Sequence, residues 1–414
     1  MTGRIILAAD RVWLGGDEAL PDMAVVVEDG RIADVLPARA VPADPAAGRF
    51  RRCGLLLPGL INAHCHLEYT WMRGRLPHGG EADFPGWLEA IRPLKAGITP
   101  EAKRAEIRRG IGELIAGGAT CVVDSFEDVA AAEELAVSPL RHVVLAEMIH
   151  LAPGADAVPA ALPPVTGVPR GPRCLGVGTN PHAPYTVNGV ARRMLVSALA
   201  ADPDIPCAWH IAETPDEVAM FEHGDGAMMD FFVRNGVPLP FAEPPGCHPA
   251  DFLRAEGLLD RCDAAFHWNI PPAGGSGCFA APRAVVHCPG THAFFRRPPF
   301  PMRELLADGA NVCLGTDSLA SGESLSMLAM LRLAAEAFPF LGAGGLLDLA
   351  TRNPARSRII RRGGVSLGEI SPGSRADIVE LAVPDGADYS GLRGVIANAG
   401  TRVSAVMIDG EWVL

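Results

Sequence analysis

Residues 54–66 read GLLLPGLINAHCH, an apolar run that ends in two histidines separated by one residue. The run favours a buried strand, because it is short, continuous and rich in aliphatic side chains. On an extended chain, side chains two positions apart point to the same side, so His64 and His66 project together from the end of this strand. A metal ion bound at this strand end is the first hypothesis that follows.

Seven further segments have the pattern of strands, and several are followed by helices with clear start signals. Thr99-Pro100 begins one such helix, and Thr214 with Glu217 begins another. Eight strands that alternate with helices predict a (β/α)8 TIM barrel rather than an open sheet. The candidate strands lie near residues 55–62, 119–124, 140–147, 174–179, 205–211, 263–267, 283–287 and 310–315.

The two ends of the chain have a different texture, with short strand-like segments joined by Asp-Gly turns. Asp29-Gly30 lies in such a hairpin near the N-terminus, and Asp409-Gly410 lies in another near the C-terminus. Neither end is large enough to bury a core alone, so we expect them to pair. This reasoning predicts a small β-sandwich domain built from residues 1–53 and 365–414, beside a catalytic barrel at 54–364.

The overall composition indicates which binding partners and which cellular location to expect. The formal net charge of -12 over 414 residues argues against a nucleic acid or an anionic membrane as the main partner. We see no signal-peptide pattern and no apolar stretch long enough to cross a bilayer. The 10 cysteines form no CxxC pair, which favours reduced thiols and a cytoplasmic location.

Three later strands carry imidazole or carboxylate side chains at their carboxyl ends, namely His210, His267 and Asp317. In a parallel barrel these ends converge on one mouth. Three imidazoles and one carboxylate suit a single divalent ion, with Zn2+ favoured and Fe2+ as the alternative. Such an ion makes a bound water more acidic and so supplies a nucleophile for hydrolysis. The predicted ligands are His64, His66, His210 and Asp317.

Three residues of this set are also candidates for catalysis. Asp317 is placed to accept a proton from the water. Glu213, three residues beyond His210, is placed to protonate a substrate nitrogen, and His267 to orient the water or polarise the reacting carbon. Each residue alone has an ordinary structural explanation, such as a turn cap for Asp317. It is their combination that predicts a metal-activated hydrolase.

Other candidates remain open at this stage. His182 lies at the end of the fourth predicted strand, and His287 and His292 lie at the end of the seventh. Each of the three either contacts the substrate or supports the structure. The chain has two lysines, Lys95 and Lys103, and both precede the second barrel strand. A carboxylated lysine that bridges two metal ions is therefore not available, so one metal ion is expected.

Taken in order, these motifs resemble the amidohydrolase superfamily, and within it the deaminase and chlorohydrolase branch. Residues 57–66 resemble its first-strand motif, 210–214 (HIAET) its HxAE segment, and 314–318 (LGTDS) its last-strand motif. The resemblance covers nearly the whole chain. It implies a mononuclear zinc or iron site, a homodimer, and hydrolytic removal of ammonia from a small aminated heterocycle.

The resemblance says less about the ring. Residues 84–88 (FPGWL) are similar to a segment of adenosine-thioether deaminases, which implies that Trp87 contacts the substrate; we expect the same of Ser318, beside Asp317. Residues 287–295 (HCPGTHAFF) look closer to aminofutalosine deaminases. Two residues depart from the thioether pattern. Lys95 stands where an acid near the ribose is common, and His292 stands where an asparagine is usual.

Three hypotheses follow from the sequence. The first is an aminohydrolase of an amino-substituted purine-like ring or nucleoside. The second is related hydrolytic chemistry, either opening of a ring amide or removal of chloride from a triazine, and ammonia release separates it from the first. The third is a metal-stabilised scaffold without turnover. Glu213 and His267 argue against that scaffold, because a structural site favours four closed ligands without a proton shuttle.

Overall fold

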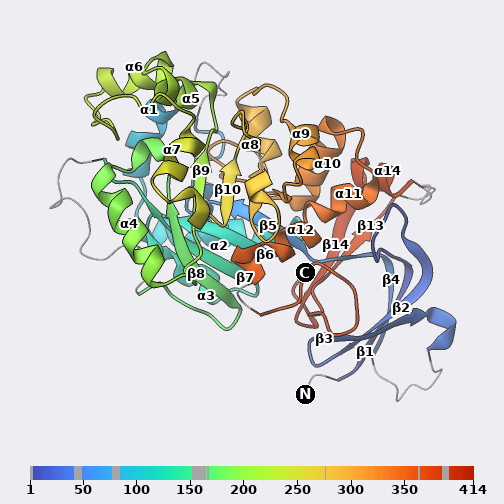
Figure 1. The fold of residues 1–414 in the computed structure, drawn as a ribbon. Coiled ribbons are helices and arrows are strands. Elements are labelled where there is room, and N and C mark those ends of the chain that lie inside the picture. Colours follow the sequence, from blue (N-terminus) through green and yellow to red (C-terminus); the bar gives the residue numbers. More distant parts are fainter. Residues whose placement is uncertain are drawn as a thin grey trace.

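The computed structural model describes residues 3–41, 49–76, 84–151, 165, 167–275, 277–361, 364–384 and 391–414. Figure 1 shows two regions side by side: strands surrounded by helices, and a separate sheet in which the blue N-terminal and red C-terminal strands run together. The sequence pattern predicted this division between the middle and the ends of the chain.

Eight parallel strands form the framework of the helical region. They lie in two four-stranded sheets, ordered β5-β6-β7-β8 and β12-β11-β10-β9. Single bridges join the sheets at both seams, Thr179 to Cys207 and Cys65 to Asp317. The strands are β5 (Leu60–Cys65), β6 (Ala119–Phe126), β7 (Arg141–Met148), β8 (Cys174–Pro181), β9 (Ala208–Ile211), β10 (Ala264–His267), β11 (Ala284–His287) and β12 (Val312–Leu314).

The first predicted strand is in fact two strands that meet at Gly59. β4 (Arg49–Pro58) belongs to the terminal sheet, and β5 begins at Leu60. The N–H of Gly59 donates to the carbonyl of Asp377 (2.8 Å), and a Cβ at this position would lie 2.2 Å from Thr120 Oγ1. A single strand over 55–62 was therefore wrong. Both strands are buried, so the apolar run carries no sign of the break.

The two chain ends build one seven-stranded sheet, ordered β15-β14-β13-β4-β1-β2-β3. β1 and β4 run parallel, and the other neighbours are antiparallel. The described residues of both ends form this one sheet, whereas the predicted sandwich requires two. The remaining strands are β1 (Ile5–Val12), β2 (Leu20–Glu28), β3 (Arg31–Pro37), β13 (Ile378–Ala382), β14 (Arg402–Ile408) and β15 (Glu411–Trp412).

The helices cover the outside of the parallel strands (Figure 1). Both predicted caps are confirmed, because the Thr99 hydroxyl accepts from Ala102 N (3.3 Å) and the Thr214 hydroxyl from Glu217 N (2.9 Å). The helices are α1 (Phe84–Lys95), α2 (Pro100–Ala116), α3 (Glu133–Ala136), α4 (Gly189–Ala201), α5 (Pro215–Glu222), α6 (Gly226–Arg234), α7 (Pro249–Ala255), α8 (Pro289–Phe294), α9 (Met302–Ala307), α10 (Met327–Ala337), α11 (Ala343–Asp348), α12 (Arg352–Arg356), α13 (Arg358–Arg361) and α14 (Leu392–Ala397).

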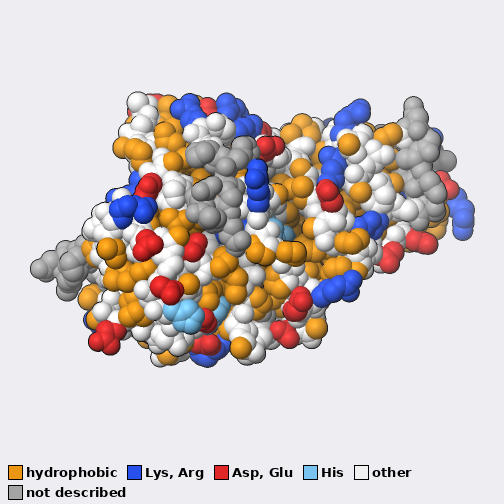
Figure 2. Space-filling model, turned by 90° about the horizontal axis from the view of Figure 1, so that it is seen from above, with side chains coloured by type: hydrophobic (Ala, Val, Ile, Leu, Met, Phe, Trp, Pro, Cys, Tyr) orange, Lys and Arg blue, Asp and Glu red, His pale blue; other side chains and the backbone are white. Residues whose placement is uncertain are grey.

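The described residues allow three features to be checked: the distribution of surface charge, the presence of membrane-spanning helices and the state of the cysteines. On the face shown in Figure 2, acidic and basic side chains are interspersed among apolar ones. Within the described residues, no helix combines the length and apolar character that crossing a bilayer requires. All ten cysteines are free thiols, as the absence of paired spacing predicts.

Candidate active site

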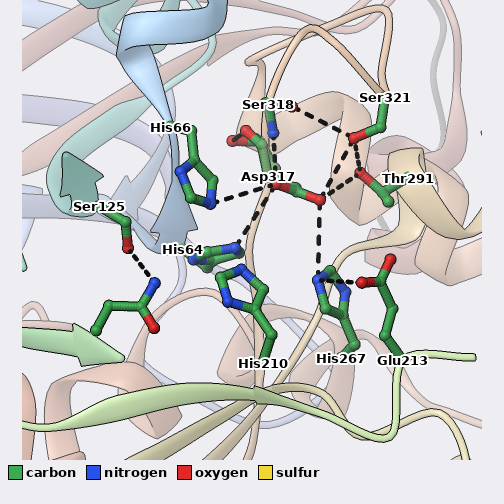
Figure 3. A network of polar contacts seen from close by, with 12 residues as sticks. His64, His66, Ser125, His210, Glu213, His267, Thr291, Asp317, Ser318 and Ser321 are labelled. Atoms are coloured by element: carbon green, nitrogen blue, oxygen red, sulfur yellow. Dashed lines mark hydrogen bonds and ion pairs between the residues drawn. The ribbon is translucent and has the colours of Figure 1, made fainter. Parts of the chain in front are cut away.

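The predicted histidines and carboxylates meet at the carboxyl ends of the parallel strands (Figure 3). His64 lies in β5, and His66 directly follows that strand. Their Nε2 atoms lie 3.6 and 3.8 Å from Asp317 Oδ1. His64, His66 and His210 offer nitrogens that lie within 4.8 Å of one another, and so do the ligand atoms of His64, His267 and Asp317. Residues more than 200 positions apart in the chain thus form one cluster.

The rings of His64 and His210 are oriented so that some of their nitrogens make no hydrogen bond within the protein. His64 is fully buried and stacks on Phe266 (ring centroids 3.8 Å apart), and neither of its ring nitrogens has a hydrogen-bond partner among the described residues. His210 Nδ1 donates to the carbonyl of His182 (2.7 Å), which leaves Nε2 free to bind. Unpaired buried nitrogens cost free energy, and a bound cation satisfies them. The donor set therefore fits a divalent metal ion.

Asp317 is fixed by hydrogen bonds to both of its oxygens. Oδ1 accepts from Ser318 N (2.8 Å), and Oδ2 accepts from the hydroxyls of Thr291 (3.0 Å) and Ser321 (3.4 Å). Burial, together with the nearby Glu213 carboxylate, raises the pKa of Asp317 to about 7. Its position is set before any ligand binds, which is what a metal ligand needs.

Glu213 and His267 lie beside this cluster. Glu213 Oε2 is 3.8 Å from His267 Nε2, and that nitrogen is 3.9 Å from Asp317 Oδ2. The backbone N–H groups of Ala212 and Glu213 donate to the carboxylate of Glu217 (3.0 and 2.9 Å). Glu217, which the sequence marked only as part of a helix start, therefore holds the backbone that carries Glu213.

The backbone is strained at these strand ends. Ala212, His267 and Asp317 have φ values of 51°, 68° and 57°, in the left-handed region that non-glycine residues rarely adopt. Such residues cost of order 1–3 kcal/mol each and persist where the surroundings hold them. For Asp317 the surroundings include its N–H, which donates to the carbonyl of His64 (3.0 Å). The left-handed turn aims Asp317 back at the histidines.

A cavity of about 320 Å³ opens over the cluster. This volume is in the range of small-molecule sites. Its floor is polar and includes His66, Glu147, His210, Glu213, His267 and Asp317, whereas aromatic side chains form much of the wall. The aromatic members are Tyr69, Phe84, Trp87, Tyr185, Phe231, Phe232 and Phe295. Flat aromatic walls over a polar floor suit a planar heterocycle.

Three of the five predicted substrate contacts line this cavity, namely Trp87, His182 and Ser318. Trp87 is held by a hydrogen bond from its Nε1 to the carbonyl of Ala320 (3.1 Å). His287 and His292 are not among the lining residues. The His287 ring stacks on Phe300, with centroids 3.9 Å apart, and His292 Nε2 donates to the carbonyl of Pro298 (2.8 Å). Both histidines serve the packing behind the cavity.

Comparison with protein families decides the class of the protein. The sequence matches the model of the Amidohydrolase family over residues 55–413. The chain belongs to the amidohydrolase family. As such it is a hydrolase that acts on carbon–nitrogen bonds, which confirms the predicted superfamily and enzyme class.

Individual relatives of this amidohydrolase are deaminases. The 8-oxoguanine deaminase of Pseudomonas aeruginosa is 28% identical, over 94% of this chain and 88% of that protein. The aminodeoxyfutalosine deaminase of Deinococcus radiodurans is 29% identical, over 86% of this chain and 88% of that protein. A solved structure of an adenosine deaminase from Xanthomonas campestris with bound zinc has a TM-score of 0.72 at 26% identity, over 99% of this chain and 92% of that chain. These likenesses agree with the predicted TIM-barrel class.

Two buried residues of the amidohydrolase site escaped the sequence analysis. Glu147, the residue before the last of β7, lines the cavity, where its Oε1 accepts from Asn180 Nδ2 (3.1 Å) and lies 3.9 Å from His66 Nδ1. The strand-end rule that selected His210 selects Glu147 equally. Arg297 Nη2 donates to Glu213 Oε1 (2.9 Å). No motif marks Arg297, because it follows α8 in an irregular segment.

Proposed function

We propose that this amidohydrolase is a metal-dependent aminohydrolase of an amino-substituted purine-like ring, as a free base or within a nucleoside. In the overall reaction, a ring carbon loses its amino group as ammonia and gains the oxygen of water, which leaves a ring carbonyl. One observation carries the proposal: Glu213, His267 and Asp317 lie in a chain of contacts of 3.8 and 3.9 Å beside unpaired histidine nitrogens.

We propose one zinc ion, with ferrous iron as the alternative, held by His64, His66, His210 and Asp317. Three imidazoles and a carboxylate suit either ion. When bound, the ion supplies a more acidic water as the nucleophile. The carbonyl of His182 sets the tautomer of His210, because Nδ1 carries the proton of that hydrogen bond and Nε2 is left to bind the ion.

The side chains around the ion have separate tasks in this proposal. Asp317 accepts the proton of the attacking water, and His267 orients that water toward the ring carbon. Glu213, protonated at the start, delivers its proton to the ring nitrogen. It then takes the proton that the new hydroxyl group loses as the ring carbonyl forms and delivers it to the departing amino group, so that ammonia leaves as a neutral molecule. The proton held by Asp317 finally returns to Glu213, which restores both groups. The aromatic walls, Trp87 among them, hold the ring, and His182 and Ser318 contact its polar edge.

Aminofutalosine is one candidate within this class, and the likeness to an aminodeoxyfutalosine deaminase supports it. The likeness to 8-oxoguanine deaminase supports a free base equally. Lys95 bears on the choice. It lines the cavity and pairs with Glu127, at a position where thioether deaminases often carry an acid near the ribose. A carboxylate can accept hydrogen bonds from the two hydroxyls of a ribose, whereas a lysine cannot. Lys95 therefore favours a substrate without a ribose diol at that position.

The larger architecture is part of the proposal. We propose that the two parallel sheets close into one (β/α)8 barrel spanning residues 54–364, and that residues 1–53 and 365–414 form a composite β-domain around the seven-stranded sheet. The single bridges at both seams support closure. A homodimeric assembly and a cytoplasmic location also stay proposals, since they rest on the resemblance and the composition.

The decisive experiment measures ammonia release from adenine, adenosine, methylthioadenosine, 8-oxoguanine, aminofutalosine and aminopterins, with the metal content of the protein quantified. We expect ammonia from one ring class and its loss on chelation. A fully metallated protein that releases no ammonia from any of them contradicts the proposal. Assays for chloride release from triazines and for ring-amide opening then test the alternative chemistry.

A further inference from the structure

We propose that Arg297 is a positioning residue that fixes the Glu213 carboxylate, so that Oε1 is occupied and Oε2 is the oxygen that moves protons. This inference rests on the proposed role of Glu213 in the deaminase reaction. Arg297 Nη2 donates to Glu213 Oε1 at 2.9 Å, and Oε2 of the same carboxylate faces His267 Nε2 at 3.8 Å. The two oxygens are thereby assigned different partners.

The ion pair between Arg297 and Glu213 is buried, unlike an ordinary surface ion pair. The Arg297 side chain is 1% exposed, and that of Glu213 is 9% exposed. The guanidinium lies over two neighbouring rings of the cavity wall, with Cζ 5.2 Å from the centroid of Phe84 and 4.8 Å from that of Phe295. Within the described residues, its Nε and Nη1 have no hydrogen-bond partner. Burying a guanidinium whose N–H groups lack acceptors costs free energy of folding, and the bond to Glu213 offsets part of that cost.

Glu213 is thus held at two points. Glu217 accepts from its backbone N–H (2.9 Å), and Arg297 holds one side-chain oxygen. Arg297 itself is placed by a short turn in which its N–H donates to the carbonyl of His292 (3.1 Å), while His292 Nε2 donates to the carbonyl of Pro298 (2.8 Å). This arrangement gives His292 a role behind the cavity wall. A proton donor acts efficiently when its geometry is set in advance, because small displacements of a reacting group lower the rate steeply.

The test compares Arg297→Met with Arg192→Met in metallated protein. Arg192 is a matched control, because it is also buried (4% exposed) and pairs with a glutamate, Glu256, outside the cavity lining. We expect Arg297→Met to lower kcat on the order of 10²-fold with little change in KM, and Arg192→Met to leave kcat unchanged. Arg297→Lys, which keeps the charge but loses the planar fork, should recover part of kcat. Native kcat in Arg297→Met, or an equal loss in Arg192→Met, overturns the inference.

A second measurement does not depend on the substrate. The melting temperatures of Arg297→Met, Glu213→Gln and the double variant form a cycle in which a buried pair gives non-additive shifts. We expect the double variant to lose less than the sum of the single losses, because each single change leaves the other group without its partner. Additive shifts overturn the inference. If the native protein releases no ammonia, the proposed function fails while this cycle still decides the pairing.

Discussion

Asn62, in β5, and Thr316, which follows the end of β12, are joined by two hydrogen bonds. Asn62 Nδ2 donates to Thr316 Oγ1 (2.8 Å), and Thr316 N donates to Asn62 Oδ1 (3.1 Å). Both residues are fully or almost fully buried, and they lie two positions before His64 and one before Asp317. The pair therefore sets the distance between two predicted metal ligands from opposite ends of the framework.

Replacing Asn62 with leucine should weaken metal binding. The change removes both bonds, at about 0.5–1.5 kcal/mol each, and Thr316 keeps only the bonds from its N–H to the carbonyl of His64 (3.1 Å) and from its hydroxyl to the carbonyl of Asp317 (3.2 Å). Loss of supporting contacts around ligands typically lowers metal affinity about 10- to 100-fold. Titration with a competing chelator measures the affinity. Asn311→Leu is the control, because buried Asn311 bonds to the carbonyls of Arg283 and Asn353 and should lower stability alone. Unchanged affinity in Asn62→Leu contradicts this prediction.

Glu213→Gln should abolish most turnover while the protein keeps its metal. The amide cannot carry the proton that the leaving amino group requires, and loss of general acid–base catalysis lowers kcat about 10²- to 10⁴-fold. Steady-state ammonia release and elemental analysis are the measurements. Glu222→Gln, at the end of helix α5, which begins just after Glu213, lies outside the cavity lining and serves as the control. Turnover at the native rate would remove Glu213 from the mechanism.

Metal removal should destabilise the folded protein. An ion that binds the native cluster and not the unfolded chain adds about 2.7 kcal/mol when it is present at 100 times its Kd. We expect a chelator to lower Tm and zinc to restore it, with one ion per chain by elemental analysis. His66→Ala should lose the ion and most of the chelator effect. His223→Ala, at an exposed site (65%), should keep both. A chelator effect of native size in His66→Ala argues against the proposed ligand set.

Acid should destabilise the protein partly through His292. Burial, assisted by the charge of Arg297, lowers the pKa of His292 to about 4, from an ordinary value of 6.5, against the opposing effect of its bond to Pro298. The unfolded chain therefore binds this proton at a higher pH than the folded chain does. Stability contributed by neutral His292 is present above about pH 6.5 and is lost as the pH falls toward 4.

The measurement is Tm as a function of pH for the native protein and for His292→Gln. Glutamine keeps a donor for the carbonyl of Pro298 but does not titrate. We expect the Tm of the variant to fall less steeply between pH 6.5 and 4. The same slope in both proteins would show that His292 does not contribute, and would point to other buried groups such as His287, whose ring lies 5.1 Å away.

Local sequence determined much of the framework and of the cluster. Short apolar runs mark buried strands, and Thr99 and Thr214 mark helix starts, because these signals depend on neighbouring residues alone. Strand-end positions also selected His64, His210 and Asp317, since carboxyl ends of parallel strands meet wherever the strands pair. The junction at Gly59 was missed, because two buried strands in succession have the same apolar pattern as one.

The tertiary structure alone decided which side chains support that cluster. Arg297 meets Glu213 across 84 positions, and Asn62 meets Thr316 across 254. Such contacts have no periodicity or spacing that a sequence displays, because they arise from the packing of loops and seams that close only in the folded chain. The same packing places His287 and His292 outside the cavity lining and Glu147 within it. The sequence therefore determined the chemistry that is available, and the packing determined which groups share a site.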